Sequence, residues 1–163
     1  MASGDIQPFE SASTHSMGGA IKAYVASGTL ASINAGEPVQ KLAGAAGATQ
    51  FPNNGPTATI RIMGVASSVS TDTTTTSGLV DVVLAAPGQI WMIAPKVAAT
   101  WNTQAKYNAL IGSRVLIDLT AGVYTLLASD SAGNGCIVEY LDLAKYPGMV
   151  AFSWSPLCDY RNV

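Results

Sequence analysis

The stretch RVLIDLTAGVYTLL, residues 114–127, decides the fold class. It contains two runs rich in Val, Leu, Ile and Tyr, several of which are favoured in β-strands. Between the runs lies Thr120-Ala121-Gly122, a short segment whose glycine is typical of tight turns. The pattern predicts a β-hairpin with strands at 114–119 and 123–127.

Comparable runs are spread along the rest of the chain. Further strands are predicted at residues 21–25, 39–42, 57–66, 79–84, 89–93, 136–141 and 149–154. Pro87-Gly88 predicts another hairpin, between 79–84 and 89–93, because Pro and Gly suit the central positions of a reverse turn. One helix is expected, at 103–110, with Thr103 as its N-cap. Many short strands and one short helix predict an all-β fold, a mainly antiparallel β-barrel or sandwich.

Two segments lack this regularity. Residues 1–20 are predicted to form an extended N-terminal arm, and residues 21–163 a single β-rich domain. Residues 43–56 are predicted to be a flexible, uncharged loop with a contact role. The isolated apolar residues of the arm can anchor it on a neighbouring surface, although this composition fits a disordered tail equally well. The candidate contact residues are Ile6, Phe9, Met17, Ile21 and Tyr24.

The composition excludes several functional classes. Of the 163 residues 11% are charged, against about 25% in an ordinary soluble domain. The net charge of −2 argues against a nucleic-acid groove, which requires a basic patch. No run of about 18 apolar residues is present, so no membrane span is expected. The first residues lack the basic start and apolar stretch of a secretory signal.

The residues that commonly carry catalysis are sparse. His15 is the single histidine, and it lies in the polar arm, where we expect a solvated or contact role. Cys136 and Cys158 have no CxxC partner and are expected to be reduced thiols. Residues 130–135 have some features of a calcium loop but are expected to form a hairpin turn. The carboxylates of Asp118, Glu139 and Asp142 are expected to be solvated. The sequence predicts no metal, no cofactor and no enzymatic activity.

The three tryptophans, Trp91, Trp101 and Trp154, have two interpretations. They can form a platform on which sugars stack, or they can pack in the core or in an interface. Packing is favoured. The first interpretation, together with the polar loops, keeps open an alternative function as a carbohydrate- or receptor-binding module.

Several segments, taken in order, resemble the capsid decoration proteins of tailed bacteriophages, the small β-rich cement proteins of the head. The similar stretches are residues 35–39, 62–66, 78–82, 87–88, 107–114, 123–126, 130–131, 142–143 and 146–150. The similarity lies in the order and composition of these segments, and none of them is a motif specific to one family. It implies attachment to the outer surface of the virion capsid, usually as a homotrimer, through the major capsid protein and with no enzymatic role. It also implies that the N-terminal arm contacts the capsid. In the same context, the alternative of a carbohydrate- or receptor-binding module would place the chain in a phage tail or fibre.

The low charge agrees with that expectation. Centres of protein interfaces are depleted in Lys and Glu and enriched in aromatic residues and Met. An oligomer that engages several capsid sites at once gains effective concentration, so modest individual contacts are sufficient. Cyclic symmetry makes a trimer a natural arrangement.

Overall fold

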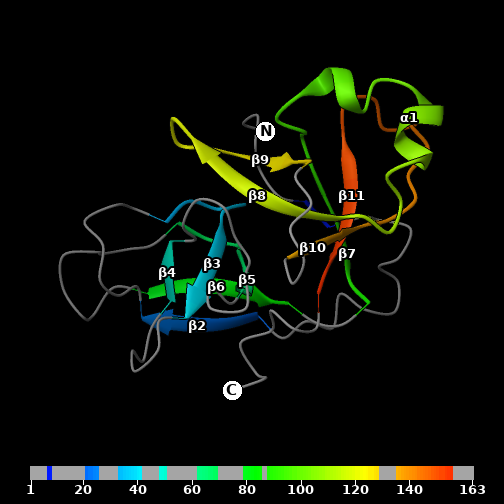
Figure 1. Cartoon of the computed structure of the whole chain (residues 1–163). Coiled ribbons are helices and arrows are strands. Elements are labelled where there is room, and N and C mark those ends of the chain that lie inside the picture. Colours follow the sequence, from blue (N-terminus) through cyan, green and yellow to red (C-terminus); the bar gives the residue numbers. More distant parts are fainter. Residues whose placement is uncertain are drawn as a thin grey trace.

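The computed structural model describes residues 7–8, 21–25, 33–41, 48–50, 62–69, 79–85, 88–128 and 135–155. They form two antiparallel sheets that lie side by side (Figure 1). The six-stranded sheet has the order β1 (Gln7–Pro8), β7 (Ile90–Ile93), β11 (Val150–Trp154), β10 (Cys136–Val138), β8 (Arg114–Thr120), β9 (Val123–Leu127). The five-stranded sheet has the order β2 (Ile21–Val25), β6 (Leu79–Leu84), β5 (Ile62–Ala66), β3 (Pro38–Lys41), β4 (Ala48–Gln50).

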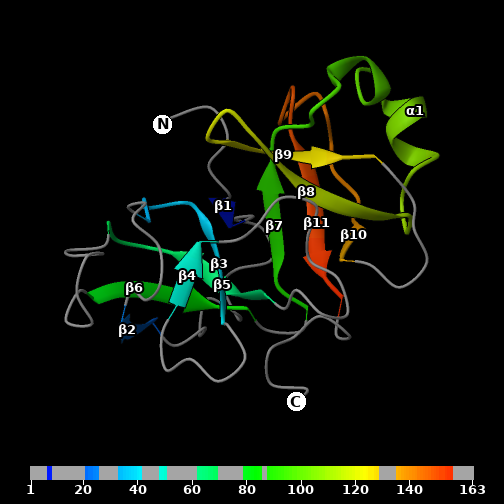
Figure 2. The same cartoon turned by 60° about the vertical axis from the view of Figure 1, so that its left-hand side comes forward.

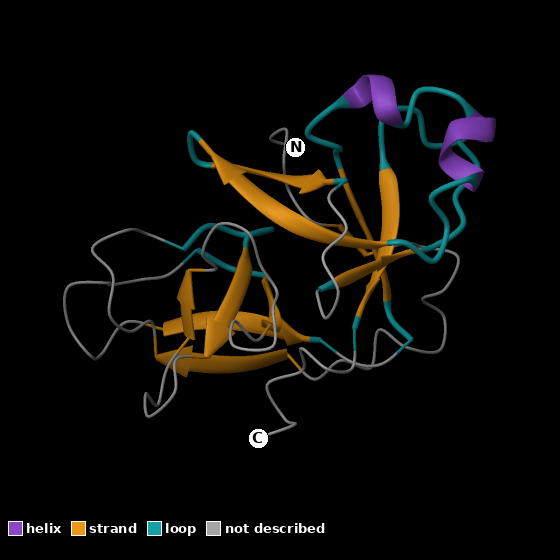
Figure 3. Cartoon of the chain, in the orientation of Figure 1, coloured by secondary structure: helices purple, strands orange, loops and turns teal. Residues whose placement is uncertain are grey.

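Within the described residues, helical structure lies at one end of the six-stranded sheet (Figure 3). It consists of the 3-10 turn η2 (Ala98–Thr100) and helix α1 (Gln104–Asn108). The hydroxyl of Thr103 accepts a hydrogen bond from the backbone N–H of Lys106 at 3.3 Å, which confirms Thr103 as the N-cap. The predicted all-β, mainly antiparallel fold with one short helix is therefore confirmed, as a sandwich-like pair of sheets.

The six-stranded sheet curls strongly without closing as a barrel. Just after β7, Pro95 forms an isolated parallel bridge with Leu126 of β9. The backbone N–H of Lys96 donates to the carbonyl of Leu126 at 2.8 Å, and the N–H of Leu126 donates to Ala94 at 2.9 Å. The curl wraps the sheet around the larger hydrophobic core.

The hairpin predicted at 114–127 is confirmed. β8 and β9 pair from Leu116–Leu127 to Thr120–Val123. The two-residue turn has positive φ at both positions, 52° at Ala121 and 79° at Gly122. Positive φ at both positions is typical of the type I′ turn, whose twist matches that of the flanking strands.

The hairpin predicted around Pro87-Gly88 is wrong. β6 pairs with β2 and β5, whereas β7 pairs with β1 and β11 in the other sheet. Gly88 has the positive φ of 79° expected of a turn glycine. The turn therefore leads from one sheet to the other, because the flanking strands bury their side chains in different clusters: Val80 and Val82 in one, Trp91 and Ile93 in the other.

Other boundaries differ from the predictions in smaller ways. β4 lies inside the predicted loop 43–56 and pairs with β3. β1 lies inside the predicted irregular arm. The strand predicted at 136–141 ends at Val138. Of the strand predicted at 57–66, residues 62–66 are a strand and residues 57–61 lie outside the described residues.

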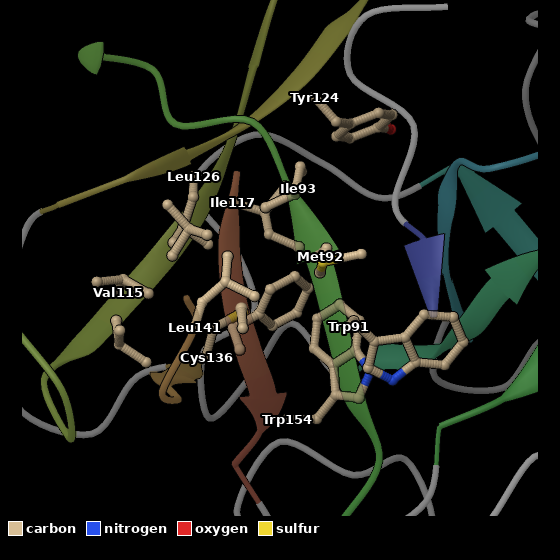
Figure 4. Packing of buried hydrophobic residues seen from close by; sticks show 14 of the residues in the cluster. Trp91, Met92, Ile93, Val115, Ile117, Tyr124, Leu126, Cys136, Leu141 and Trp154 are labelled. Atoms are coloured by element: carbon tan, nitrogen blue, oxygen red, sulfur yellow. The ribbon is translucent and has the colours of Figure 1, made fainter. Parts of the chain in front are cut away.

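Among the described residues, two hydrophobic clusters stabilise the fold. The larger fills the concave side of the six-stranded sheet (Figure 4). The smaller lies on the five-stranded sheet and contains Ile33, Val39, Met63, Ala66, Val80 and Val82. β5 contributes to both, because Ile62 and Val65 belong to the larger cluster while Met63 and Ala66 belong to the smaller. Strict alternation along a strand cannot place residues three apart on one side.

A local irregularity in the β3–β5 pairing resolves this conflict. Val39 pairs with Gly64 and Gln40 with Ile62, so Met63 is the additional residue of a bulge. At Gly64 the neighbouring strand comes very close, since a Cβ atom there would clash with the carbonyl oxygen of Val83. A residue without a side chain is therefore required at this position.

Gly64→Ala is expected to destabilise the fold by about 3 kcal/mol or more, because the clash is with backbone and cannot be relieved by a side-chain rotation. Gly88→Ala is the matched control, since open space surrounds Gly88 and only the strain of positive φ, about 1–2 kcal/mol, applies. Urea unfolding measures the loss of stability in both variants. Equal losses for the two variants would contradict the role assigned to Gly64.

Ala121→Asn is expected to stabilise the β8–β9 hairpin by about 0.5–1 kcal/mol, because Asn tolerates the left-handed conformation better than Ala. Ala121→Val, which places a β-branched side chain at the same positive φ, is expected to destabilise it. Thermal unfolding of both variants tests the turn assignment, and a lower melting temperature for Ala121→Asn would refute it.

Candidate interaction surface

The first 25 residues supply one edge strand of each sheet. β1 is the outermost strand beside β7, and β2 is the outermost strand beside β6 (Figure 2). Edge strands present backbone N–H and C=O groups that can pair with another chain. The N-terminal segment therefore occupies one of the two edges of each sheet, where strand pairing with a partner can occur, while β9 and β4 form the opposite edges.

Two of the five predicted contact residues lie in one of these edge strands. Ile21 and Tyr24 lie in β2, opposite Val83 and Val80 of β6. Ile6, Phe9 and Met17 lie outside the described residues, as does His15. The structure thus places two of the five residues on one edge strand.

β1 meets β7 next to an aromatic cluster. Gln7 pairs with Met92 and Pro8 with Trp91. Pro is compatible with this position because it cannot donate to a ladder and is tolerated at a sheet edge. The rings of Trp91 and Trp154 lie 6.4 Å apart, and Phe152 packs edge-on against Trp154 at 4.9 Å.

The tryptophans are core residues, as favoured from the sequence. Trp91, Trp101 and Trp154 are 3%, 3% and 5% exposed, so they form no platform on which a sugar could stack. Trp101 packs edge-on against Tyr107 at 5.7 Å. Within the described part of the chain, the three buried indole Nε1 atoms have no hydrogen-bond acceptor.

Tyr107 fixes α1 to the six-stranded sheet. Its hydroxyl donates to the carbonyl of Glu139 at 2.9 Å and accepts from the N–H of Ala151 at 2.9 Å. Burial raises the pKa of Tyr107 to about 12. Nearby, the hydroxyl of Ser153 donates to Glu139 Oε1 at 2.6 Å. These hydrogen bonds connect α1, the segment that follows β10, and β11.

The expectation that the carboxylate of Asp118 is solvated is wrong. It is 3% exposed and pairs with Lys96 at 2.8 Å, while the hydroxyl of Thr120 donates to the same oxygen at 2.6 Å. Burial alone would raise the pKa of Asp118, but the hydrogen bonds from Lys96 and Thr120 and the charge of Lys96 lower it below its usual value. β8 can bury this carboxylate because the segment after β7 brings a cation to it.

The remaining chemical candidates are structural or lie outside the described residues. Glu139 is half-buried and bonded to Ser153, and the carboxylate of half-buried Asp142 accepts from the N–H of Ala144 at 3.0 Å. Cys136 is a buried thiol, and Cys158 and residues 130–134 are not described. Across the described ranges, no group of three His, Cys, Asp or Glu residues could hold a metal ion. Those ranges also contain no helix of the length and hydrophobicity needed to cross a membrane.

Several large apolar side chains are exposed in the described part. They are Val69, Leu79, Val97, Ile111, Val123 and Tyr140. Hydrogen bonds between Gly112 and Val138 and between Val138 and Ser113, at 2.9 and 3.0 Å, extend the β8–β10 pairing and bring the segments that carry Ile111 and Tyr140 side by side. Large apolar residues at interface centres are common, so these positions are compatible with contacts to other proteins.

No family model matches the chain, and no match was found among curated proteins or solved structures.

Replacing Asp118 with Asn is expected to flatten the acid limb of the stability profile. The pKa of Asp118 is lower in the folded chain than in the unfolded chain, so its contribution is complete above the unfolded value and disappears as the pH falls through the folded value. Urea unfolding between pH 2 and 7 should show that, as the pH falls, the free energy of unfolding decreases less for Asp118→Asn than for wild type. Asp142→Asn is the control; an unchanged slope in Asp118→Asn would contradict the pairing.

Proposed function

We propose that this chain is a viral structural protein that decorates and stabilises the outer surface of a phage capsid. In this proposal it binds the major capsid protein as a homotrimer and acts in the virion without a catalytic role. The observation that carries the proposal is the position of the N-terminal segment, which forms an edge strand of both sheets. The resemblance assigns capsid contact to this same segment.

The surface properties support the same role. Only 11% of the residues are charged, and six large apolar side chains are exposed among the described residues. An edge strand can bind a partner through backbone hydrogen bonds without matching charges. Three copies bound together on a capsid multiply such modest contacts through effective concentration.

The alternative of a carbohydrate-binding module loses the feature on which it was based. That interpretation required exposed tryptophans, and all three are buried in the larger core cluster. No other observation on the described residues favours glycan binding, so the capsid role is the one proposed.

Deletion of residues 1–20 is expected to abolish binding to capsids that lack the protein while leaving the body folded. The deletion removes β1 but leaves β2 and the remainder of both sheets. Co-sedimentation with capsids measures binding, and circular dichroism checks the fold. Lys145→Ala, a change at an exposed residue outside the N-terminal segment, is the control and should bind like wild type.

Normal decoration by the folded, truncated chain would show that the arm is not the contact. Absence of capsid binding by the full-length chain would contradict the proposed function itself. The two outcomes are separate, because the second concerns the intact protein.

A further inference from the structure

The segment that follows β7 forms a strap, residues 94–100, which passes the edge of β9 (Figure 2). The N–H of Leu126 donates to the carbonyl of Ala94, and the N–H of Lys96 donates to the carbonyl of Leu126. Pro95, between these two residues, has no N–H to donate. The contact is an isolated bridge rather than a continuous ladder, so the backbone pairing alone contributes little stability.

The side chain of Lys96 adds a second attachment, to the next strand. Its Nζ lies 2.8 Å from Oδ2 of Asp118 on β8, and the hydroxyl of Thr120 donates to the same oxygen at 2.6 Å. One residue therefore makes both attachments, since the N–H of Lys96 pairs with β9 while its ammonium group reaches β8. Because both contacts depend on the position of Lys96, the loss of one weakens the other.

The charge of Lys96 faces no competing charge among the described neighbours of Asp118. Ile117 belongs to the larger core cluster, so the alternation along β8 places Asp118 on the opposite face of the hairpin. Its described neighbours on that face are uncharged: Leu116, Thr120 and Thr125. Arg114, the other charged residue of the hairpin, is four positions away, and Lys96 is the charged residue of the strap. The state of this contact is therefore set by the charges of Lys96 and Asp118.

The strap can leave β9 while the core stays intact. Ile93 and Trp101, on either side of the strap, are 0% and 3% exposed and belong to the larger hydrophobic cluster. Within the strap, Val97 is 53% exposed and the side chain of Lys96 is 38% exposed. Segments with few buried apolar contacts open at a lower free energy than the core. We therefore expect the strap to open as a local unit.

We propose that the Lys96–Asp118 ion pair is a latch, which holds the strap on β9 and releases it when either residue loses its charge. Acid is the condition that removes the charge of Asp118. Because the pKa of Asp118 in the folded chain lies below its usual value, the latch stays closed until the pH falls through that lowered value. Release removes the partners of the N–H and C=O of Leu126 and lengthens the open edge of β9. This inference concerns the protein alone and does not require capsid binding.

Amide hydrogen exchange, measured by NMR at pH 7, tests the latch directly. Lys96→Met keeps a long side chain but removes its charge. We expect the amide of Leu126 to exchange about tenfold faster in this variant than in wild type. The amide of Glu139, which donates to Ala151 in the same sheet, should keep its rate. Lys96→Arg, which retains the charge, and Lys145→Met, at an exposed residue outside the strap, are the controls and should match wild type.

Acid provides a second measurement on the wild-type chain, which does not depend on the folding of a variant. As the pH falls through the folded pKa of Asp118, the protection of the Leu126 amide should decrease relative to that of Glu139. In Lys96→Met this relative protection should not change with pH. Equal exchange at Leu126 in Lys96→Met and wild type would overturn the proposal. Equal acceleration at Leu126 and Glu139 would also overturn it, because the sheet would then open as a whole.

Discussion

The fold depends on strand β5, which must bury side chains on both of its faces. All five of its residues are buried, and they contribute to both hydrophobic clusters. A regular strand presents alternate residues to opposite faces, so the bulge at Met63 and the close approach at Gly64 are what allow Ile62 and Val65 to share one cluster. The five-stranded sheet is joined to the six-stranded sheet through this shared core.

Sequence reasoning succeeded where local cues and long-range packing agree. The β8–β9 hairpin was predictable because Gly122 marks the turn and the flanking runs are long enough to bury one face each. Thr103 was recognisable as an N-cap because its hydroxyl acts on a residue three positions away. The burial of the tryptophans was the favoured interpretation because large aromatic side chains commonly pack in cores and interfaces.

The wrong predictions concern strand pairing and burial that are set by segments far apart in the sequence. Pro87-Gly88 indicates a turn but not which strands pair after it, so β6 and β7 were assigned to one hairpin. β4 was missed because Ala48, Thr49 and Gln50 offer no apolar alternation, and its pairing with β3 comes from the sheet. Asp118 was expected in solvent because its partner, Lys96, is 22 positions away in the sequence. The edge position of β1 was likewise invisible, since Gln-Pro carries no strand signal.

The central claim is that the N-terminal segment, at the edges of both sheets, carries this protein onto a capsid. The most direct measurement is an image reconstruction of the virion at a resolution that separates individual chains. The account predicts trimeric density on the outer surface of the head, with the first 25 residues of each copy lying against the major capsid protein or a neighbouring copy. Density confined to the tail or its fibres, or bodies on the head whose N-terminal segments point into solvent, would contradict it.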